Sequence, residues 1–126
     1  MSNSYIFAEG APEAVGPYSH AVKSGSLLYT SGQLGLDPRT GGLADGVEAQ
    51  AQLALSNLKA VLAAADMDMS DVIKTTVFLT NMDDFAAING IYAEAFGDSK
   101  PARSCVAVAA LPKGAAFEVE AVACKG

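Results

Sequence analysis

Apolar residues recur at helical spacing in two stretches of the chain. Asp45 precedes the first stretch and Glu48 follows three residues later, a pattern typical of a capped helix start. The second stretch runs from about residue 83 to residue 96, with Asn81 as its expected N-cap and Gly97 just beyond its end. The pattern predicts two amphipathic helices. Their apolar faces are Val47, Ala51, Ala54, Leu55, Leu58, Val61, Leu62 and Ala65, then Phe85, Ile88, Tyr92 and Phe96.

Short β-branched, aromatic or alternating runs surround these helices. We expect strands over residues 21–24, 27–31, 72–79, 102–108 and 117–124. Strands and helices interleave, but the glycine turn at Gly25 requires an antiparallel hairpin, so the sheet should be mixed. The 126 residues suffice for a single domain, residues 1–126. The predicted fold is α+β, with two helices on one sheet face and no helix left to cover the other.

Side-chain alternation along the last two strands groups the polar residues. Phe117, Val119, Ala121 and Ala123 form an apolar face, and Glu118 and Glu120 point the other way. If Ala102, Ser104, Val106 and Val108 also pack on the helices, Arg103 and Cys105 lie with these carboxylates on the uncovered face. Arg103 then either pairs with one of the two glutamates or receives a carboxylate from a ligand. The alternation leaves both interpretations open.

Other polar residues stand in apolar or turn settings. Asn89 interrupts the apolar stripe of the second helix, Tyr18 follows a Gly-Pro turn, and Ser31 ends a strand before Gly32, where glycine lets a backbone approach closely. Each has a structural use as well as a ligand-binding one. Cys105 has no assured base beside it, so packing is as good an explanation as nucleophilic chemistry.

Composition narrows the classes of function. Formal net charge is −6 with a pI near 4.5, and the Lys and Arg residues are scattered, which argues against general nucleic-acid binding. His20 is the single histidine, and no spacing fits a metal or nucleotide site. Two cysteines, no apolar run of membrane-spanning length and no signal-peptide pattern at the N-terminus indicate a cytoplasmic protein with reduced thiols.

Several motifs, in order along nearly the whole chain, resemble the reactive intermediate deaminase A family, also called YjgF-like or L-PSP endoribonuclease-like. The Pro101 to Val106 segment is the specific one. The motifs are Gly16-Pro17-Tyr18-Ser19, Tyr29-Thr30-Ser31-Gly32-Gln33, Lys74-Thr75-Thr76-Val77-Phe78-Leu79, Lys100-Pro101-Ala102-Arg103-Ser104-Cys105-Val106, Leu111-Pro112-Lys113 and Glu118-Val119-Glu120-Ala121.

This resemblance implies a chorismate-mutase-like fold and a homotrimer with clefts between subunits. It implies hydrolysis of 2-imino acids such as 2-iminobutanoate and 2-iminopropanoate, released by pyridoxal-phosphate enzymes, to 2-oxo acids and ammonia without cofactor or metal. By position, Arg103 matches the arginine that binds the substrate carboxylate, and Glu118 matches the carboxylate that positions the attacking water. The rest of the pocket is matched by Tyr18, Ser31, Asn89 and Cys105.

Three positions depart from the family pattern. His20 stands where glutamine is usual, Ala110 where an arginine often precedes Leu-Pro-Lys, and Gly35 where proline is common, which should soften the loop. Alternative functions are a non-catalytic ligand-binding, chaperone-like or interaction role and, against the charge balance, an endoribonuclease.

Overall fold

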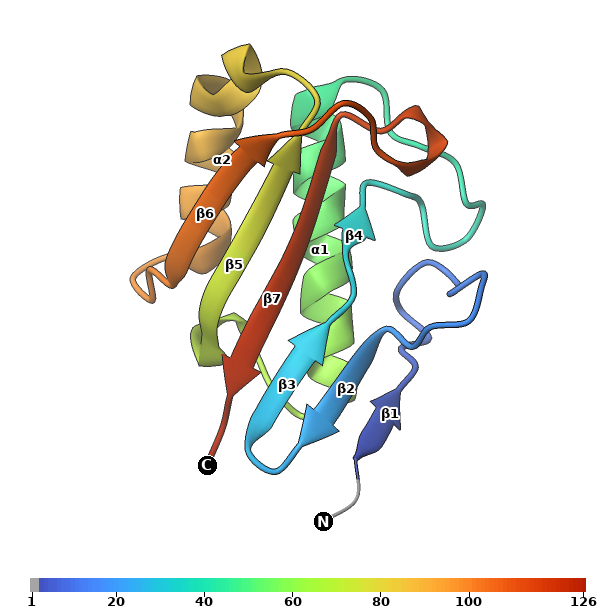
Figure 1. Cartoon of the computed structure of the whole chain (residues 1–126), viewed down its shortest axis with the longest axis vertical. Coiled ribbons are helices and arrows are strands. Elements are labelled where there is room, and N and C mark those ends of the chain that lie inside the picture. The colour runs from blue at the N-terminus through green and yellow to red at the C-terminus, as the bar shows by residue number, and fades with distance from the viewer. Residues whose placement is uncertain (1–2) are drawn as a thin grey trace.

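A computed structural model describes residues 3–126, and its strands form one seven-stranded mixed sheet (Figure 1). Along the sheet the order is β1-β2-β3-β7-β5-β6, and the short β4 also pairs with β7. β6 runs parallel to β5, and every other pairing is antiparallel. The predicted mixed sheet is therefore confirmed. The strands are β1 (Ser4–Ile6), β2 (Ala21–Ser24), β3 (Leu27–Thr30), β4 (Gln33–Leu34), β5 (Val72–Leu79), β6 (Ala102–Ala107) and β7 (Phe117–Cys124).

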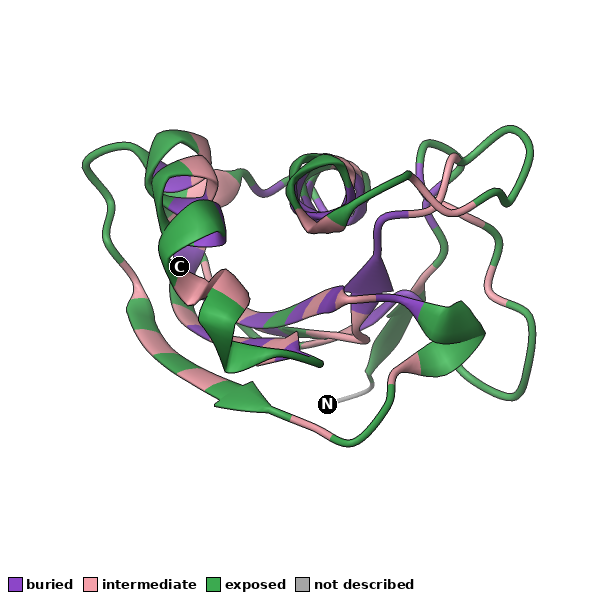
Figure 2. Cartoon of the chain, turned by 90° about the horizontal axis from the view of Figure 1, so that it is seen from above, coloured by how far each residue is buried: buried purple, intermediate pink, exposed green. Residues whose placement is uncertain are grey.

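Two helices, α1 (Val47–Ala64) and α2 (Phe85–Phe96), cover one side of the sheet and leave the other open, as Figure 2 shows. The predicted placement of both helices on one face is confirmed. Burying a large apolar side chain between these layers contributes roughly 1.5–3 kcal/mol. The largest fully buried apolar side chains are Phe117, Leu28, Leu58, Leu62, Leu79, Ile88, Val61, Val77 and Val119.

The helix ends differ in detail from the sequence pattern. The prediction that Asp45 caps α1 was wrong, because the N-cap is Gly46, at φ 90°, and no side chain bonds the helix start. A short 3₁₀ turn, Met82–Asp84, precedes α2, and the Asn81 side chain accepts the backbone N–H of Asp83 there. Gly97 ends α2 with φ 59°. Neither helix is long and apolar enough to cross a bilayer in the part of the chain described here.

Arg103 and Cys105 lie on the helix-covered face of β6, not on the open face. Arg103 pairs with Thr75 of β5, which is fully buried beneath the helices, and strand partners point to the same side. The prediction that these two residues share a face with Glu118 and Glu120 was wrong. Small residues occupy both faces of β6, so its composition gave no sign of which face the helices cover.

His20 joins two segments near the N-terminus. Its Nδ1 accepts the backbone N–H of Ala8 at 2.8 Å, so Nε2 carries the hydrogen and donates it to the carbonyl of Pro12 at 2.7 Å. The ring is therefore buried, with both nitrogens hydrogen-bonded. This histidine fixes the chain between β1 and β2.

Gly35 lets the loop after β4 pack directly against α1. A Cβ at this position would lie 2.5 Å from both Cα and the carbonyl oxygen of Gln50, too close for any other residue without movement. The carbonyl of Gly35 also accepts the backbone N–H of Ala44 at 2.9 Å. The glycine thus holds a tightly packed loop in place.

Candidate functional site

Arg103 is held by one face of α2. Its guanidinium carbon lies 4.7 Å from the ring centroid of Tyr92 and 5.1 Å from that of Phe85, within the range of cation–π attraction. Its Nη1 donates a hydrogen bond to Oδ1 of Asn89 at 2.8 Å. Residues 85, 89 and 92 are one and two turns apart on the helix, so a single face supplies all three contacts.

The charge of Arg103 is not neutralised by a carboxylate within residues 3–126. The only ion pair there joins Arg39 to Asp37. Because Glu118 and Glu120 point to the opposite face of the sheet from Arg103, the interpretation of Arg103 as half of a structural ion pair was wrong. A half-buried, positively charged fork with free donors is suited to receive a carboxylate from another molecule.

Tyr92 is fixed from beneath by the sheet. Its hydroxyl lies 2.6 Å from Oγ1 of the fully buried Thr75 on β5, and its ring centroid is 4.7 Å from that of Phe96. Burial raises the pKa of Tyr92 despite the opposing effects of Thr75 and Arg103. The phenol therefore stays neutral at physiological pH and keeps its ring available to the cation above it.

Cys105 lies two residues beyond Arg103 on the same face of β6 and packs against the core. Burial raises the pKa of its thiol, and the nearby Arg103 only partly opposes that effect. The side chain is therefore a neutral thiol near neutral pH, which suits packing beside a ligand better than nucleophilic attack.

Tyr18, Ser31 and Glu118 line a second region, a cavity of about 680 Å³ beside β4 and the start of β7. Ser31 donates its hydroxyl hydrogen to the carbonyl of Ser19 at 2.7 Å, which ties the end of β3 to the 12–20 segment. The phenol of Tyr18 is about half exposed, at 46%. Both side chains thus reach the cavity that Glu118 enters from β7.

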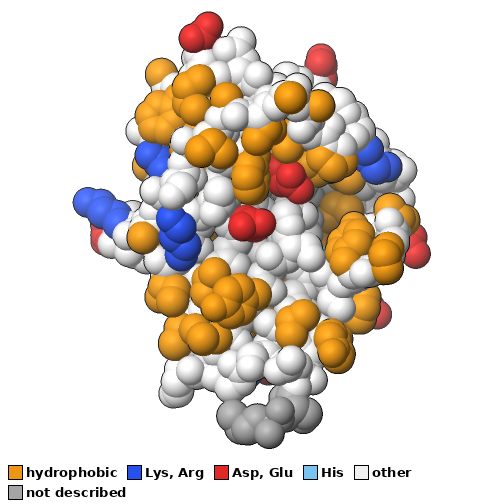
Figure 3. Space-filling model, viewed as in Figure 1, with side chains coloured by type: hydrophobic (Ala, Val, Ile, Leu, Met, Phe, Trp, Pro, Cys, Tyr) orange, Lys and Arg blue, Asp and Glu red, His pale blue; other side chains and the backbone are white. Residues whose placement is uncertain are grey.

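Glu118 is a half-buried carboxyl on the open side of the sheet. Burial raises its pKa, and the like charge of Glu120 two residues away raises it further. Figure 3 shows acidic side chains near the middle of this face with apolar side chains around them. A carboxyl of this kind exchanges a proton closer to neutral pH than a solvated glutamate does.

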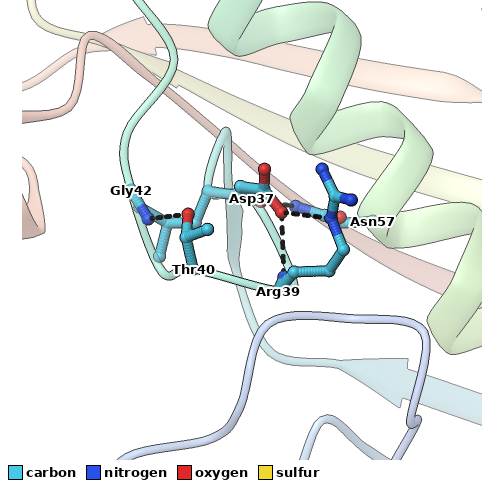
Figure 4. A network of polar contacts seen from close by, with 6 residues as sticks. Asp37, Arg39, Thr40, Gly42 and Asn57 are labelled. Atoms are coloured by element: carbon cyan, nitrogen blue, oxygen red, sulfur yellow. Dashed lines mark hydrogen bonds and ion pairs between the residues drawn. The ribbon is translucent and has the colours of Figure 1, made fainter.

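The turn after β4 forms the outer rim of the cavity. The Asp37 carboxylate accepts the backbone N–H of Arg39 at 2.8 Å, and Thr40 accepts that of Gly42 at 3.1 Å (Figure 4). Asn57 of α1 donates to the carbonyls of Leu34 and Leu36 and anchors the turn to the helix. The side chain of Arg39 itself is 88% exposed.

The predicted site residues therefore form two groups in one chain. The first, Arg103, Asn89 and Cys105, lies between β6 and α2, and the second, Tyr18, Ser31 and Glu118, lines the cavity. By sequence pattern, Phe85 and Tyr92 belong to the apolar face of the helix, with no apparent link to Arg103. The sequence did contain a signal for this contact, since an aromatic residue, an amide and a second aromatic residue lie in a row on that helix face.

Gly32 makes room for the Glu118 carboxyl. A Cβ at Gly32 would overlap Oε2 of Glu118 and lie 2.7 Å from its Cδ, so the group that approaches this glycine is a side chain and not the backbone that the sequence predicted. We expect Gly32→Ala to leave the fold intact, since a flexible side chain yields more easily than backbone, and to push the carboxyl toward solvent. A crystal structure and a carboxyl-carbon NMR titration should show Glu118 displaced and its pKa nearer the ordinary glutamate range.

Gly90→Ala provides the matched control, because a Cβ there meets open space. It should leave the Glu118 titration unchanged. An unmoved Glu118 in Gly32→Ala would contradict the steric role given to this glycine.

Fold and site together define an α+β protein in which an edge strand presents, under one helix, an arginine that has no carboxylate partner among residues 3–126. A family model described as Endoribonuclease L-PSP matches residues 8–125. The chain therefore belongs to the Endoribonuclease L-PSP family, the family of the Rid proteins. The resemblance seen in the sequence motifs is confirmed.

Named relatives cover nearly the whole chain. The 2-iminobutanoate/2-iminopropanoate deaminase of Salmonella typhimurium is 47% identical over 121 residues, which cover 94% of each chain. The crystal structure of E. coli TdcF with bound serine superposes with a TM-score of 0.94 at 44% identity, covering 98% of this chain and 99% of that one. RidA from an Antarctic Psychrobacter gives a TM-score of 0.94 at 44% identity, covering 97% and 99%.

Proposed function

We propose that this protein hydrolyses reactive 2-imino acids, with 2-iminobutanoate and 2-iminopropanoate as substrates, to 2-oxo acids and ammonia. The observation that carries the proposal is the charged guanidinium of Arg103, which has no carboxylate partner within the described chain and is matched to a carboxylate by its shape. The relative from Salmonella typhimurium, which is named for this activity, supports the choice of substrates. In the cytoplasm the reaction would clear imine by-products of pyridoxal-phosphate enzymes.

The active form in this proposal is a homotrimer with sites between subunits. Arg103 and Glu118 point to opposite faces of one sheet, so a site that uses both must take them from two chains. The open sheet face also exposes large apolar side chains of the kind that a subunit interface covers, including Tyr29 and Val106, at 55% and 43% exposed.

The chemistry needs a held substrate and an activated water. Arg103 binds the substrate carboxylate through two parallel hydrogen bonds, which fixes the neighbouring imine carbon in place. Glu118 accepts a proton from water as the oxygen attacks that carbon, forming a carbinolamine. Starting from the protonated imine, Glu118 then passes that proton to the amine nitrogen of the carbinolamine. The C–N bond breaks and ammonia leaves as the C=O bond of the 2-oxo acid forms, and the hydroxyl gives its proton back to the Glu118 carboxylate.

The remaining matched residues shape the pocket. Asn89 accepts from the guanidinium and fixes one of its ends, and Cys105 packs beside it as a neutral thiol. Tyr18 and Ser31 line the side from which Glu118 approaches. None of these steps requires a bound metal or an organic cofactor.

The test generates 2-iminopropanoate with an amino-acid oxidase and catalase in the presence of semicarbazide, which traps the imine that escapes hydrolysis. We expect the protein to lower the amount of trapped imine and to release pyruvate. If several imino acids react with semicarbazide equally fast with and without the protein, the deaminase proposal is wrong. Propanoate binding by the same protein would then indicate a ligand-binding role without turnover.

A further inference from the structure

The guanidinium of Arg103 is held in place without being neutralised. Two aromatic rings of α2, those of Phe85 and Tyr92, lie 5.1 and 4.7 Å from its carbon, and the Asn89 amide oxygen accepts one of its five N–H donors. Rings and amides carry no formal charge, so these contacts restrain the group and leave its positive charge available. A carboxylate partner would restrain it equally well but would occupy the donors that a ligand needs.

The restraint extends into the sheet through Tyr92. Its hydroxyl lies 2.6 Å from Oγ1 of Thr75, and Thr75 is the direct strand partner of Arg103 in the β5–β6 ladder. The ring over the guanidinium is therefore tied to the same pair of strands from which Arg103 projects. This closed arrangement fixes the height and the plane of the guanidinium relative to β6.

Two of the three guanidinium nitrogens of Arg103 remain available to a ligand. Nη1 is committed to Asn89, while Nε and Nη2 make no hydrogen bond to any residue from 3 to 126. These two nitrogens form the side edge of the guanidinium, which is one of the two edges that bind a carboxylate in bidentate fashion. Rotation about the Nε–Cζ bond or swinging of the side chain would misplace that edge.

We propose that Phe85 and Tyr92 are positioning residues, which hold Arg103 so that its Nε–Nη2 edge faces the bound carboxylate. The inference rests on the proposed function for the identity of the group that this edge receives. The rings contact the guanidinium, and they act by keeping the arginine in its binding orientation before the ligand arrives. Preorganisation of this kind raises affinity because less side-chain freedom is lost on binding.

The experiment follows the guanidinium signals of Arg103 by NMR. The chain has two arginines, so the Arg39→Lys background leaves Arg103 as the single source of guanidinium signals in hydrogen–nitrogen NMR spectra. Propanoate, an unreactive monocarboxylate, is the probe. We expect the Arg103 Nε–H signal to shift on titration and rotation about Nε–Cζ to be slow in the wild-type ring environment.

Ring removal should loosen and weaken the site. We expect Tyr92→Leu to weaken propanoate binding about tenfold and Phe85→Leu about threefold, with faster guanidinium rotation in both. Tyr92→Phe keeps the ring and should bind within about threefold of the parent. Ile91→Val, on the same helix but lining the groove toward α1, is the matched control and should change neither readout.

The outcomes separate this inference from the proposed function, because binding and rotation are measured without turnover. Folded Tyr92→Leu and Phe85→Leu proteins with unchanged propanoate affinity and unchanged rotation would overturn the inference, even in an active deaminase. Weakened binding with no imine hydrolysis by the wild type would support the inference and refute the function. If Tyr92→Leu does not fold, the more exposed Phe85 and the conservative Tyr92→Phe decide the question.

Discussion

Two inactive variants of this protein should restore activity to each other. Arg103→Ala removes the group that binds the carboxylate, and Glu118→Gln removes the proton acceptor, so each alone should lower the hydrolysis rate by about 10²-fold or more. In a trimer whose sites combine Arg103 of one chain with Glu118 of the next, a random equal mixture leaves about one quarter of the sites intact. Co-expression of the two variants, followed by the semicarbazide assay, measures this recovery.

The expectation follows from the sheet geometry. Thr75 opposite Arg103 is buried under the helices, while Phe78 opposite Glu118 belongs to the other face, so one chain cannot direct both side chains at the same substrate. Lys59→Ala is the matched control for loss of a positive charge, since Lys59 is exposed on α1 and does not line the cavity that Glu118 enters. It should keep wild-type activity.

A double variant that carries both Arg103→Ala and Glu118→Gln is the control for this recovery of activity. Mixed with either single variant, it should restore nothing, because no interface then holds both intact groups. If the two single variants also stay inactive when mixed, while size measurements show that they have assembled together, the shared site is refuted. Recovery by simple addition of separately folded proteins would point to subunit exchange on the assay's timescale.

The sequence predicted most of the elements because their patterns are long and periodic. The strands over 72–79 and 117–124 appear with those bounds, and the first helix begins at Val47 as its apolar face indicated. β1 and β4 were not predicted. β4 has only two residues, Gln33 and Leu34, too few to show alternation, and its pairing with β7 is decided by tertiary contacts.

The site was harder to predict than the fold. Glu118 was correctly placed on the uncovered face because Phe117 and Val119 beside it are large and apolar, which makes the alternation unambiguous. β6 offers only small residues on both faces around Arg103. Its orientation depends on which of its faces meets the rings of α2, a long-range contact that no local pattern encodes. The family motifs name the same candidate residues whichever face the helices cover, because motif matching does not depend on the face.

Activity should fall on acidification at a higher pH than for a solvated glutamate. Burial raises the pKa of Glu118, and the charge of Glu120 raises it further. Since the carboxylate form accepts the proton from water, kcat/KM should decline as pH falls through this raised pKa. Glu120→Gln removes the smaller of the two causes, so it should move the decline to lower pH but not abolish the shift. Profiles from about pH 4 to about pH 8, corrected for spontaneous hydrolysis, test this.

The raised pKa of Glu118 also predicts that its ionised carboxylate lowers the stability of the folded protein at neutral pH. A carboxylate held for structural reasons would raise that stability. A carboxyl whose pKa is raised by folding binds its proton more readily in the folded than in the unfolded chain, so above the unfolded pKa the ionised group opposes folding. Glu118→Gln should therefore melt no lower than wild type at neutral pH while losing activity. Glu94→Gln, at an exposed position of α2, should change neither property. A Glu118→Gln protein that is clearly less stable than wild type would show that this carboxyl is held for the fold. A Glu120→Gln profile that coincides with wild type would show that the charge of Glu120 does not contribute to the raised pKa of Glu118.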